Sequence, residues 1–362
     1  MPDTTPPISA VSRSGAAAPA APGAGRHLPK FAASLLALTV IVVVLLLLFV
    51  LPSLKSGARD LPIGMVGDTQ AVQVLEDQLE TVAPGAFDTA AYDDEAALRT
   101  AILDRSVVGG VIVENGSALL LTATAGSAPI AGSLTGSVTA AAASLGMPVA
   151  VDDLVAFTSD DPTGIGIGGL AFPLVFGGIV PAVVAMRVFK HSLRMQLASA
   201  CSFAAVGGLV VTAVLRFWFG SFDGSILLPA AALALGIAAI SVPLIGLQST
   251  VGGKGFTALA ASMMFLGNPL AGIGTSAAWL PSGLGLFGQL LPPGSTGTLV
   301  RSAAYFGGRG AGSALVILVV WVVAGVGLCV LGARRAAAAQ AEADATADAA
   351  PLADPTPELA LV

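Results

Sequence analysis

The feature that most constrains this chain is one uninterrupted apolar run of 21 residues, Phe31 to Leu51. It contains no charge, proline or glycine, and as a helix it would be about 31 Å long, which matches the hydrocarbon core of a bilayer. A soluble helix is seldom apolar on every face over such a length. A secretory signal peptide is the main alternative, but its apolar region is shorter and ends at a small-residue cleavage site, and no such pattern follows Leu51. We therefore predict an uncleaved transmembrane helix over residues 31–52.

The remainder of the chain has the composition of a multi-pass membrane protein. Hydrophobic residues make up 55% and charged residues 10% of the 362 residues, and the mean hydropathy is +0.87. Soluble domains carry about 25% charged residues. The predicted fold is an α-helical polytopic membrane protein with six transmembrane helices, one followed by five. The five form a membrane domain over residues 165–333, with spans at 165–186, 195–215, 226–247, 256–273 and 313–331.

The segment between the first two predicted spans, residues 53–164, has a different character. It holds 15 Asp and Glu against four Lys and Arg. Its hydrophobic periodicity predicts alternating strands and helices, and Asn115-Gly116 between two apolar runs is typical of a β-hairpin. The sequence therefore predicts a small extracytoplasmic α/β domain inserted between helices 1 and 2. The predicted elements are strands at 61–66, 107–113, 118–124 and 149–157, and helices at 69–81, 96–104 (capped by Asp93) and 127–145.

The orientation follows from the cations of the short loops. With the N-terminus inside the cell, short cytoplasmic segments carry eight Lys and Arg against three outside. The positive-inside rule thus places both termini in the cytoplasm and residues 53–164 outside the cell membrane. Residues 1–30 and 334–362 are rich in Ala, Pro, Ser or Asp, and we expect both to be disordered cytoplasmic tails.

No stretch has the spacing of a nucleotide, metal or catalytic motif. Gly252-Gly253-Lys254-Gly255 lacks the spacing and the hydroxyl of a phosphate-binding loop, and two histidines are too few for a zinc site. Within the predicted spans no acidic or basic residue lies in the core, which disfavours an ion-driven transporter. We expect that the protein lies in the lipid bilayer and has no enzymatic activity of its own. We also expect no cofactor, no metal and no nucleic-acid partner.

The loop between predicted spans two and three, residues 187–194, is short and basic. Arg187, Lys190 and Arg194 alternate with Phe189 and Leu193, a pairing suited to an apolar pocket with an acidic rim on a partner. The alternative is a solvated loop whose cations only set the topology.

The segment 274–312, between predicted spans five and six, is long, apolar and nearly uncharged. Trp279 suits a membrane interface, and Pro281, Pro292 and Pro293 punctuate the segment. We expect one or two short helices that enter the outer leaflet and return, which requires that other parts of the protein satisfy their ends. A loop lying flat on the surface is the alternative.

The order of these parts, with particular stretches, resembles the type-2 ABC exporter permease superfamily, and within it the Pip/YhgE-like (phage infection protein) membrane proteins. The resemblance covers about residues 31–333. It rests on Leu-Pro-Ile-Gly-Met-Val-Gly at 61–67, Ala-Leu-Arg-Thr-Ala-Ile at 97–102, Gly-Gly-Val-Ile-Val at 109–113, Trp-Leu-Pro at 279–281, Leu-Pro-Pro-Gly at 291–294 and Leu-Val-Arg at 299–301.

The resemblance implies a permease subunit that exports a hydrophobic or amphiphilic compound with a separate P-loop ATPase subunit docked on the basic loop. It also implies a homodimer, or a heterodimer with a similar permease, and an outer gate shaped by Arg301, Pro292 and Pro293. The alternative is a non-transporting receptor or scaffold whose acidic outer domain binds an envelope component, a protein or a phage. An ATPase that co-purifies would separate the two.

Overall fold

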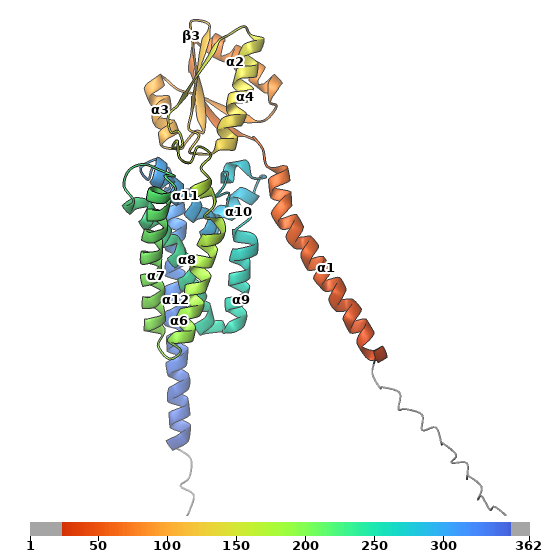
Figure 1. Ribbon diagram of the computed structural model, residues 1–362, viewed down its shortest axis with the longest axis vertical. Coiled ribbons are helices and arrows are strands. Elements are labelled where there is room, and N and C mark those ends of the chain that lie inside the picture. Colours follow the sequence, from red (N-terminus) through yellow and green to blue (C-terminus); the bar gives the residue numbers. More distant parts are fainter. Residues whose placement is uncertain (1–23, 349–362) are drawn as a thin grey trace, which may run out of the picture. The chain divides into compact units, whose positions relative to one another are not determined.

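A computed structural model describes the backbone of residues 24–348 (Figure 1). Of the predicted disordered tails, 1–30 and 334–362, the parts 1–23 and 349–362 lie outside the described residues, and the prediction is wrong for residues 24–30, which are helical. The chain divides into two compact units, Met1–Leu47 and Leu48–Val362. The long apolar helix α1 spans Ala24–Lys55, so it extends past both ends of the predicted span at 31–52.

Residues 61–153 form the α/β domain that the sequence predicts. The five-stranded sheet has the order β2-β1-β3-β4-β5; β1 runs parallel to β2 and β3, β4 runs antiparallel to β3, and β5 runs parallel to β4. The N-cap of α3 is Asp94, one residue beyond the predicted Asp93, and its carboxylate accepts a hydrogen bond from the Ala97 amide at 2.7 Å. The elements are β1 (Leu61–Gly67), α2 (Thr69–Val82), β2 (Phe87–Ala91), α3 (Glu95–Leu103), β3 (Gly109–Glu114), β4 (Ser117–Thr122), α4 (Ala128–Ser144) and β5 (Val149–Asp153).

The two faces of this sheet are covered differently. Alternation along β3 sends Val111 and Val113 to one face and Ile112 to the other. The first face packs against α2 and α4, and the second against α3 (Figure 1). A single helix covers little of a five-stranded sheet, and the second cluster is completed by Phe306, which is 5% exposed and follows helix α11 far along the chain.

Five described helical segments are long and apolar enough to cross a membrane, which defines a multi-pass membrane protein. They are Pro29–Lys55, Ile165–Val188, Leu193–Trp218, Leu227–Val251 and Gly312–Thr346. The helices of the C-terminal part are α5 (Ile165–Gly168), α6 (Ala171–Val188), α7 (Leu193–Ala213), the π-helix η1 (Val214–Trp218), α8 (Leu227–Val251), α9 (Gly253–Ser262), the π-helix η2 (Met263–Gly267), the 3₁₀ helix η3 (Ala277–Trp279), α10 (Leu284–Leu290), α11 (Pro292–Tyr305) and α12 (Gly312–Asp348).

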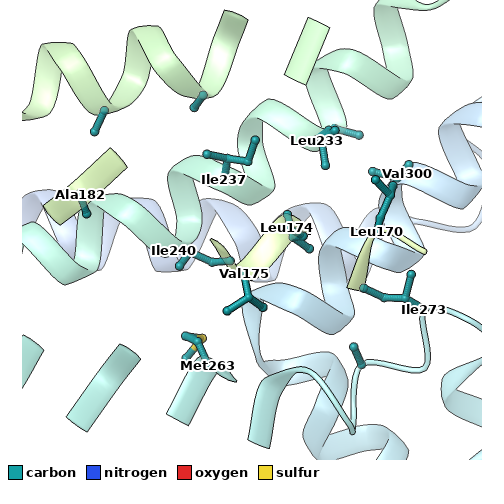
Figure 2. Close-up of a cluster of buried hydrophobic side chains, with 14 of the residues drawn as sticks. Leu170, Leu174, Val175, Ala182, Leu233, Ile237, Ile240, Met263, Ile273 and Val300 are labelled. Carbon is teal, nitrogen blue, oxygen red and sulfur yellow. The ribbon is translucent and has the colours of Figure 1, made fainter. Parts of the chain in front are cut away.

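Helix α8 is the centre of the bundle. It packs against α6, α7, α11 and α12, and Figure 2 shows its Leu233, Ile237 and Ile240 within a buried cluster that includes side chains of α6 and α11. Glycines bring the neighbours close. A Cβ on Gly208 of α7 would lie 2.7 Å from the Ala230 carbonyl oxygen, and a Cβ on Gly325 of α12 would lie 2.6 Å from the Pro243 nitrogen.

Two predictions for this part differ from the structure. The predicted span at 256–273 is not one long helix, because α9 and η2 end at Gly267 and a non-helical turn follows; the six-span count is therefore not confirmed by helix length. The predicted disorder from residue 334 is wrong up to Asp348, because α12 continues without a break. Its last turns consist mainly of alanine, the residue with the highest helix propensity.

Candidate functional site

An open, mainly apolar groove of about 700 Å³ is present in the C-terminal helical part of the chain. It lies at the end of the bundle where α5 and α6 begin and where α7 passes into the π-helix η1. Its apolar walls are formed by Leu170, Pro173, Val210, Val211, Val214 and Leu215, and Asp160 and Asp161 provide its acidic end. Mainly apolar pockets with a few polar groups at one end are typical of sites for small molecules.

The two aspartates have different roles. The carboxylate of Asp161 is buried and accepts hydrogen bonds from the Ile165 and Gly166 amides, both at 2.8 Å, so it begins α5 and fixes the groove wall. Asp160 is exposed and forms no hydrogen bond or ion pair within the part of the chain that the structure describes. Asp160 is therefore the carboxylate that can face a ligand.

Ser221 joins the groove to helix α11. Its carbonyl accepts a hydrogen bond from the Tyr305 hydroxyl at 2.7 Å, and Phe157 meets the Tyr305 ring edge-on at 5.7 Å. Burial, together with the negative charge of Asp161, raises the pKa of Tyr305, so its hydroxyl remains a donor at neutral pH. The Ser221 hydroxyl lines the groove, is fully buried and has no partner among the described residues.

The π-helix η1 changes the direction of side chains at the end of α7. Extra-residue turns of this kind interrupt the regular hydrogen-bond pattern and occur often at functional sites. Here Phe217 is 73% exposed and Trp218 is 82% exposed, although both are large and apolar. Trp218 lines the groove, and both rings line a neighbouring open apolar pocket.

The basic loop predicted as a docking surface is a tight turn between α6 and α7. Arg187, Lys190 and Arg194 are exposed, as the prediction requires. Phe189 is half-buried, and its carbonyl accepts a hydrogen bond from the Gln196 side chain at 2.9 Å. Leu193 packs against the bundle core. The exposed apolar residues are instead Val188, at 64%, and Met195, at 48%, which the sequence analysis did not select.

The five residues chosen for an outer re-entrant segment or gate lie in two places. Trp279 and Pro281 are half-buried around η3, and the Trp279 carbonyl accepts a hydrogen bond from the Gly57 amide at 3.0 Å. Pro292 and Pro293 are the first two residues of α11, where proline costs no hydrogen bond. Arg301 lies further along α11, just over two turns after Pro293, and is buried.

Arg301 is buried and holds a loop in place. Its exposed fraction is 5%, and its Nη atoms donate to the carbonyls of Ile273 at 2.5 Å and Thr275 at 3.2 Å. Burial and the nearby charge of Arg105 lower its pKa to about 10, so it is still a cation at neutral pH. Its role in the structure is to fix the turn after η2 rather than to face an opening.

The predicted short helices of segment 274–312 are present as α10 and α11, and several of their polar groups are paired within the protein. Gln289 donates to the Ala271 carbonyl at 3.3 Å and accepts from the Thr298 hydroxyl at 2.7 Å. Trp321 of α12 donates to the Leu290 carbonyl at the end of α10 at 2.9 Å. Such internal pairing is what a non-spanning segment needs at membrane depth.

The groove was missed by the sequence analysis, and only a weak sequence signal exists for it. Asp160 and Asp161 stand between the last strand and the next apolar run, which is typical of an ordinary helix cap. Comparison of the chain with protein-family models and with curated proteins found no match. The class of the protein therefore rests on its own helices: a multi-pass membrane protein with an inserted α/β domain.

Proposed function

We propose that this chain is the membrane permease subunit of an exporter that moves a hydrophobic or amphiphilic compound across the cell membrane, driven by a separate P-loop ATPase subunit. The observation that carries the proposal is helix α11. Its first half is buried against α8, the centre of the bundle, and the chain directly after it inserts Phe306 into the core of the α/β domain. A movement of the bundle would thus be transmitted to the α/β domain through one short, non-spanning element.

The groove supports a substrate of this class. Its walls fit an apolar tail, and the carboxylate of Asp160 fits a cationic or hydrogen-bonding head. The groove also contacts α11 indirectly, because Tyr305 donates to Ser221 in the groove wall. Occupation of the groove could in this way shift α11.

Six crossings remain part of the proposal. Ser249 at the end of α8 lies against Gly332 of α12, whereas Leu228 at the start of α8 lines a pocket with Gly312 and Leu315 at the start of α12. The two helices therefore run in the same direction. The chain between them must return across the bundle, and α9 with η2 is the segment available for that crossing.

The basic turn supports a partner ATPase on the cytoplasmic side. It offers three exposed cations around the exposed side chains of Val188 and Met195. An apolar anchor that enters a pocket supplies most of the affinity of such an interface. The proposed assembly is a dimer, homomeric or with a similar permease.

The docking test uses two matched valines. Val188 and Val251 are each the last residue of a helix, and they are 64% and 60% exposed. We expect Val188→Asp to abolish co-purification of a P-loop ATPase from detergent extracts, while Val251→Asp retains it, because the α8–α9 turn carries a single lysine. Phe189→Ala should weaken the complex, and Lys190→Ala should do less.

Failure of any ATPase to co-purify with the unaltered protein would contradict the exporter proposal and favour the receptor or scaffold. Equal loss with Val188→Asp and Val251→Asp would contradict the assignment of docking to the basic turn.

The proposed orientation has its own test. In a protein with Cys201 replaced by serine, single cysteines are placed at the exposed positions Ser117 and Gln340. A membrane-impermeant thiol reagent added to intact cells should label Ser117→Cys and leave Gln340→Cys unlabelled. The reverse pattern would contradict the placement of the α/β domain outside the cell.

A further inference from the structure

A second, smaller pocket of about 190 Å³ lies between the α/β domain and the segment that carries η3. It is separate from the groove and shares no lining residue with it. Its walls are apolar on most sides, through Ile102, Ile130 and Phe306, and its polar lining includes Arg105, Ser127 and Ser276. No Asp or Glu lines it.

Ser127 lines this pocket and carries a hydroxyl without a partner among the described residues. It is the N-cap residue of α4, a helix of 17 residues, but its side chain does not cap the helix. Its Oγ atom is buried, the residue is 7% exposed, and the hydroxyl has no partner among the described residues. The first amides of a helix lack partners within it and carry partial positive charge, and in α4 these are the amides other than that of Pro129, which has no N–H. Pocket, hydroxyl and helix N-terminus therefore meet at one place.

Arg105 brings a full positive charge to the same pocket. Its guanidinium lies over the Phe306 ring, 5.3 Å from the centroid, and donates only a long hydrogen bond of 3.4 Å to the Thr298 carbonyl. None of the ion pairs among the described residues includes it. Burial lowers the pKa of Arg105, which is the mark of a cation that has lost water without gaining a carboxylate.

Arg301 adds a second cation behind the first. It fixes Ile273 and Thr275, directly before Ser276 of the pocket wall, and its Nε atom has no partner among the described residues. Asp104, the acidic residue directly before Arg105 in the sequence, forms an ion pair with the exposed Arg309 at 3.8 Å. The positive charge around the pocket is thus not balanced from within.

We propose that this pocket binds a phosphate-type oxyanion, held by the Arg105 guanidinium, the Ser127 hydroxyl and the N-terminus of α4. Guanidinium groups and helix N-termini are both common phosphate ligands, and three donors from different directions suit a tetrahedral anion. The apolar walls leave room for a group attached to the phosphate. The ligand is therefore either free phosphate or the phosphate head of a lipid. This inference does not depend on the proposed export function.

The experiment uses the full-length protein and two matched arginines. Arg105 lines the pocket, whereas Arg309 is exposed and does not. Binding of inorganic phosphate to protein in detergent is measured by titration calorimetry, against sodium chloride of equal ionic strength. In a second arm, thermal unfolding is compared in nanodiscs of phosphatidylcholine with and without phosphatidic acid.

We expect either that inorganic phosphate binds in the first arm or that phosphatidic acid raises the unfolding temperature in the second. Arg105→Gln should weaken binding of the anion by about tenfold or more, because a hydrogen bond to a charged group is lost. Ser127→Ala should weaken it to a smaller extent, and Arg309→Gln should leave it unchanged. Binding in the first arm identifies free phosphate, and an effect confined to phosphatidic acid identifies a lipid headgroup.

Absence of binding in both arms would overturn the proposal, as would equal losses with Arg105→Gln and Arg309→Gln, which would indicate general charge screening. If Arg105→Gln does not fold, Ser127→Ala decides the question, because removal of an unpaired hydroxyl does not harm folding.

Discussion

Helices α8 and α12 are both apolar, lie side by side and run in the same direction, yet they are buried to very different extents. In the most apolar 18-residue stretch of each, 72% of the residues of α8 are buried, against 22% of those of α12. The α8 sequence holds about as many alanine, glycine and proline residues as leucine and isoleucine residues, whereas α12 exposes a row of valines.

The difference shows what selects the centre of a membrane bundle. Lipid tails are as apolar as leucine, so hydrophobicity does not decide which helix is surrounded by others. Small side chains do, because they let backbones approach. The contacts of Gly325 with Pro243, and of Gly208 with Ala230, are two points of close backbone approach, and Gly246 of α8 is a third, because its Cβ would lie 2.6 Å from the Gly325 carbonyl oxygen.

The largest expected effect comes from filling one of these contacts. Gly325→Leu would force a side chain against the backbone of Pro243, where a Cβ has 2.6 Å, and should cost about 3 kcal/mol or prevent folding. Gly327→Leu, two residues further on α12, is the control, because nothing lies within 4 Å of its Cβ. Unfolding in detergent–SDS mixtures measures both. If Gly325→Leu and Gly327→Leu destabilise the protein equally, the glycine contacts do not explain why α8 is central.

A middle-sized effect separates a buried residue of α8 from an exposed residue of α12. Ile240 is 1% exposed and Val323 is 65% exposed. Ile240→Ala leaves a cavity. Because transfer of a side chain from a lipid environment to the bundle core gains little hydrophobic free energy, the loss is mainly one of packing contacts, and it should lower the free energy of unfolding by about 2 kcal/mol. Val323→Ala should change the free energy of unfolding by less than about 0.5 kcal/mol. A similar loss at both positions would mean that another molecule covers α12.

The smallest effect concerns buried hydroxyl groups on α8 and on its neighbour α11. Ser241 is fully buried, and its hydroxyl has no partner among the described residues, whereas the buried Thr296 hydroxyl donates to the Pro292 carbonyl at 2.6 Å. Ser241→Ala should therefore be neutral or slightly stabilising, and Thr296→Val should cost about 1 kcal/mol. Thermal unfolding in detergent compares the two. If Ser241→Ala destabilises as much as Thr296→Val, a partner of Ser241 exists.

Local pattern explains why four of the five strands and all three helices of the α/β domain were predicted, whereas the mostly exposed β2 (Phe87–Ala91) was not. The alternation in β3 and β4, and the turn at Asn115-Gly116, act over a few residues, and the structure has the predicted hairpin there. The N-cap of α3 differs from the prediction by one residue, since Asp93 and Asp94 are chemically equal and the backbone selects between them. The role of Phe306 in this domain was not predictable, because Phe306 lies 153 residues after Asp153, the end of the last strand of the sheet.

In the membrane part, composition and length predicted which segments are apolar helices, but not their neighbours. The break at Gly267 and the π-helix at Val214–Trp218 depend on packing rather than on apolar content. The groove and the anion pocket consist of residues that are ordinary in sequence, such as Asp160 and Ser127. They become sites because distant segments leave a carboxylate exposed in one place and a hydroxyl unpaired in the other.

The sequence by itself determined the order of an apolar helix, an α/β domain and a helical membrane part, since each depends on hydrophobic content or on periods of two and 3.6 residues. Only the tertiary structure decided that α8 is central, that Arg301 fixes a loop, and that Phe306 completes the core of the α/β domain. The physical reason is that burial, hydrogen-bond partners and uncompensated charge belong to pairs of distant residues, and hydrophobicity along the chain does not encode which pairs will meet.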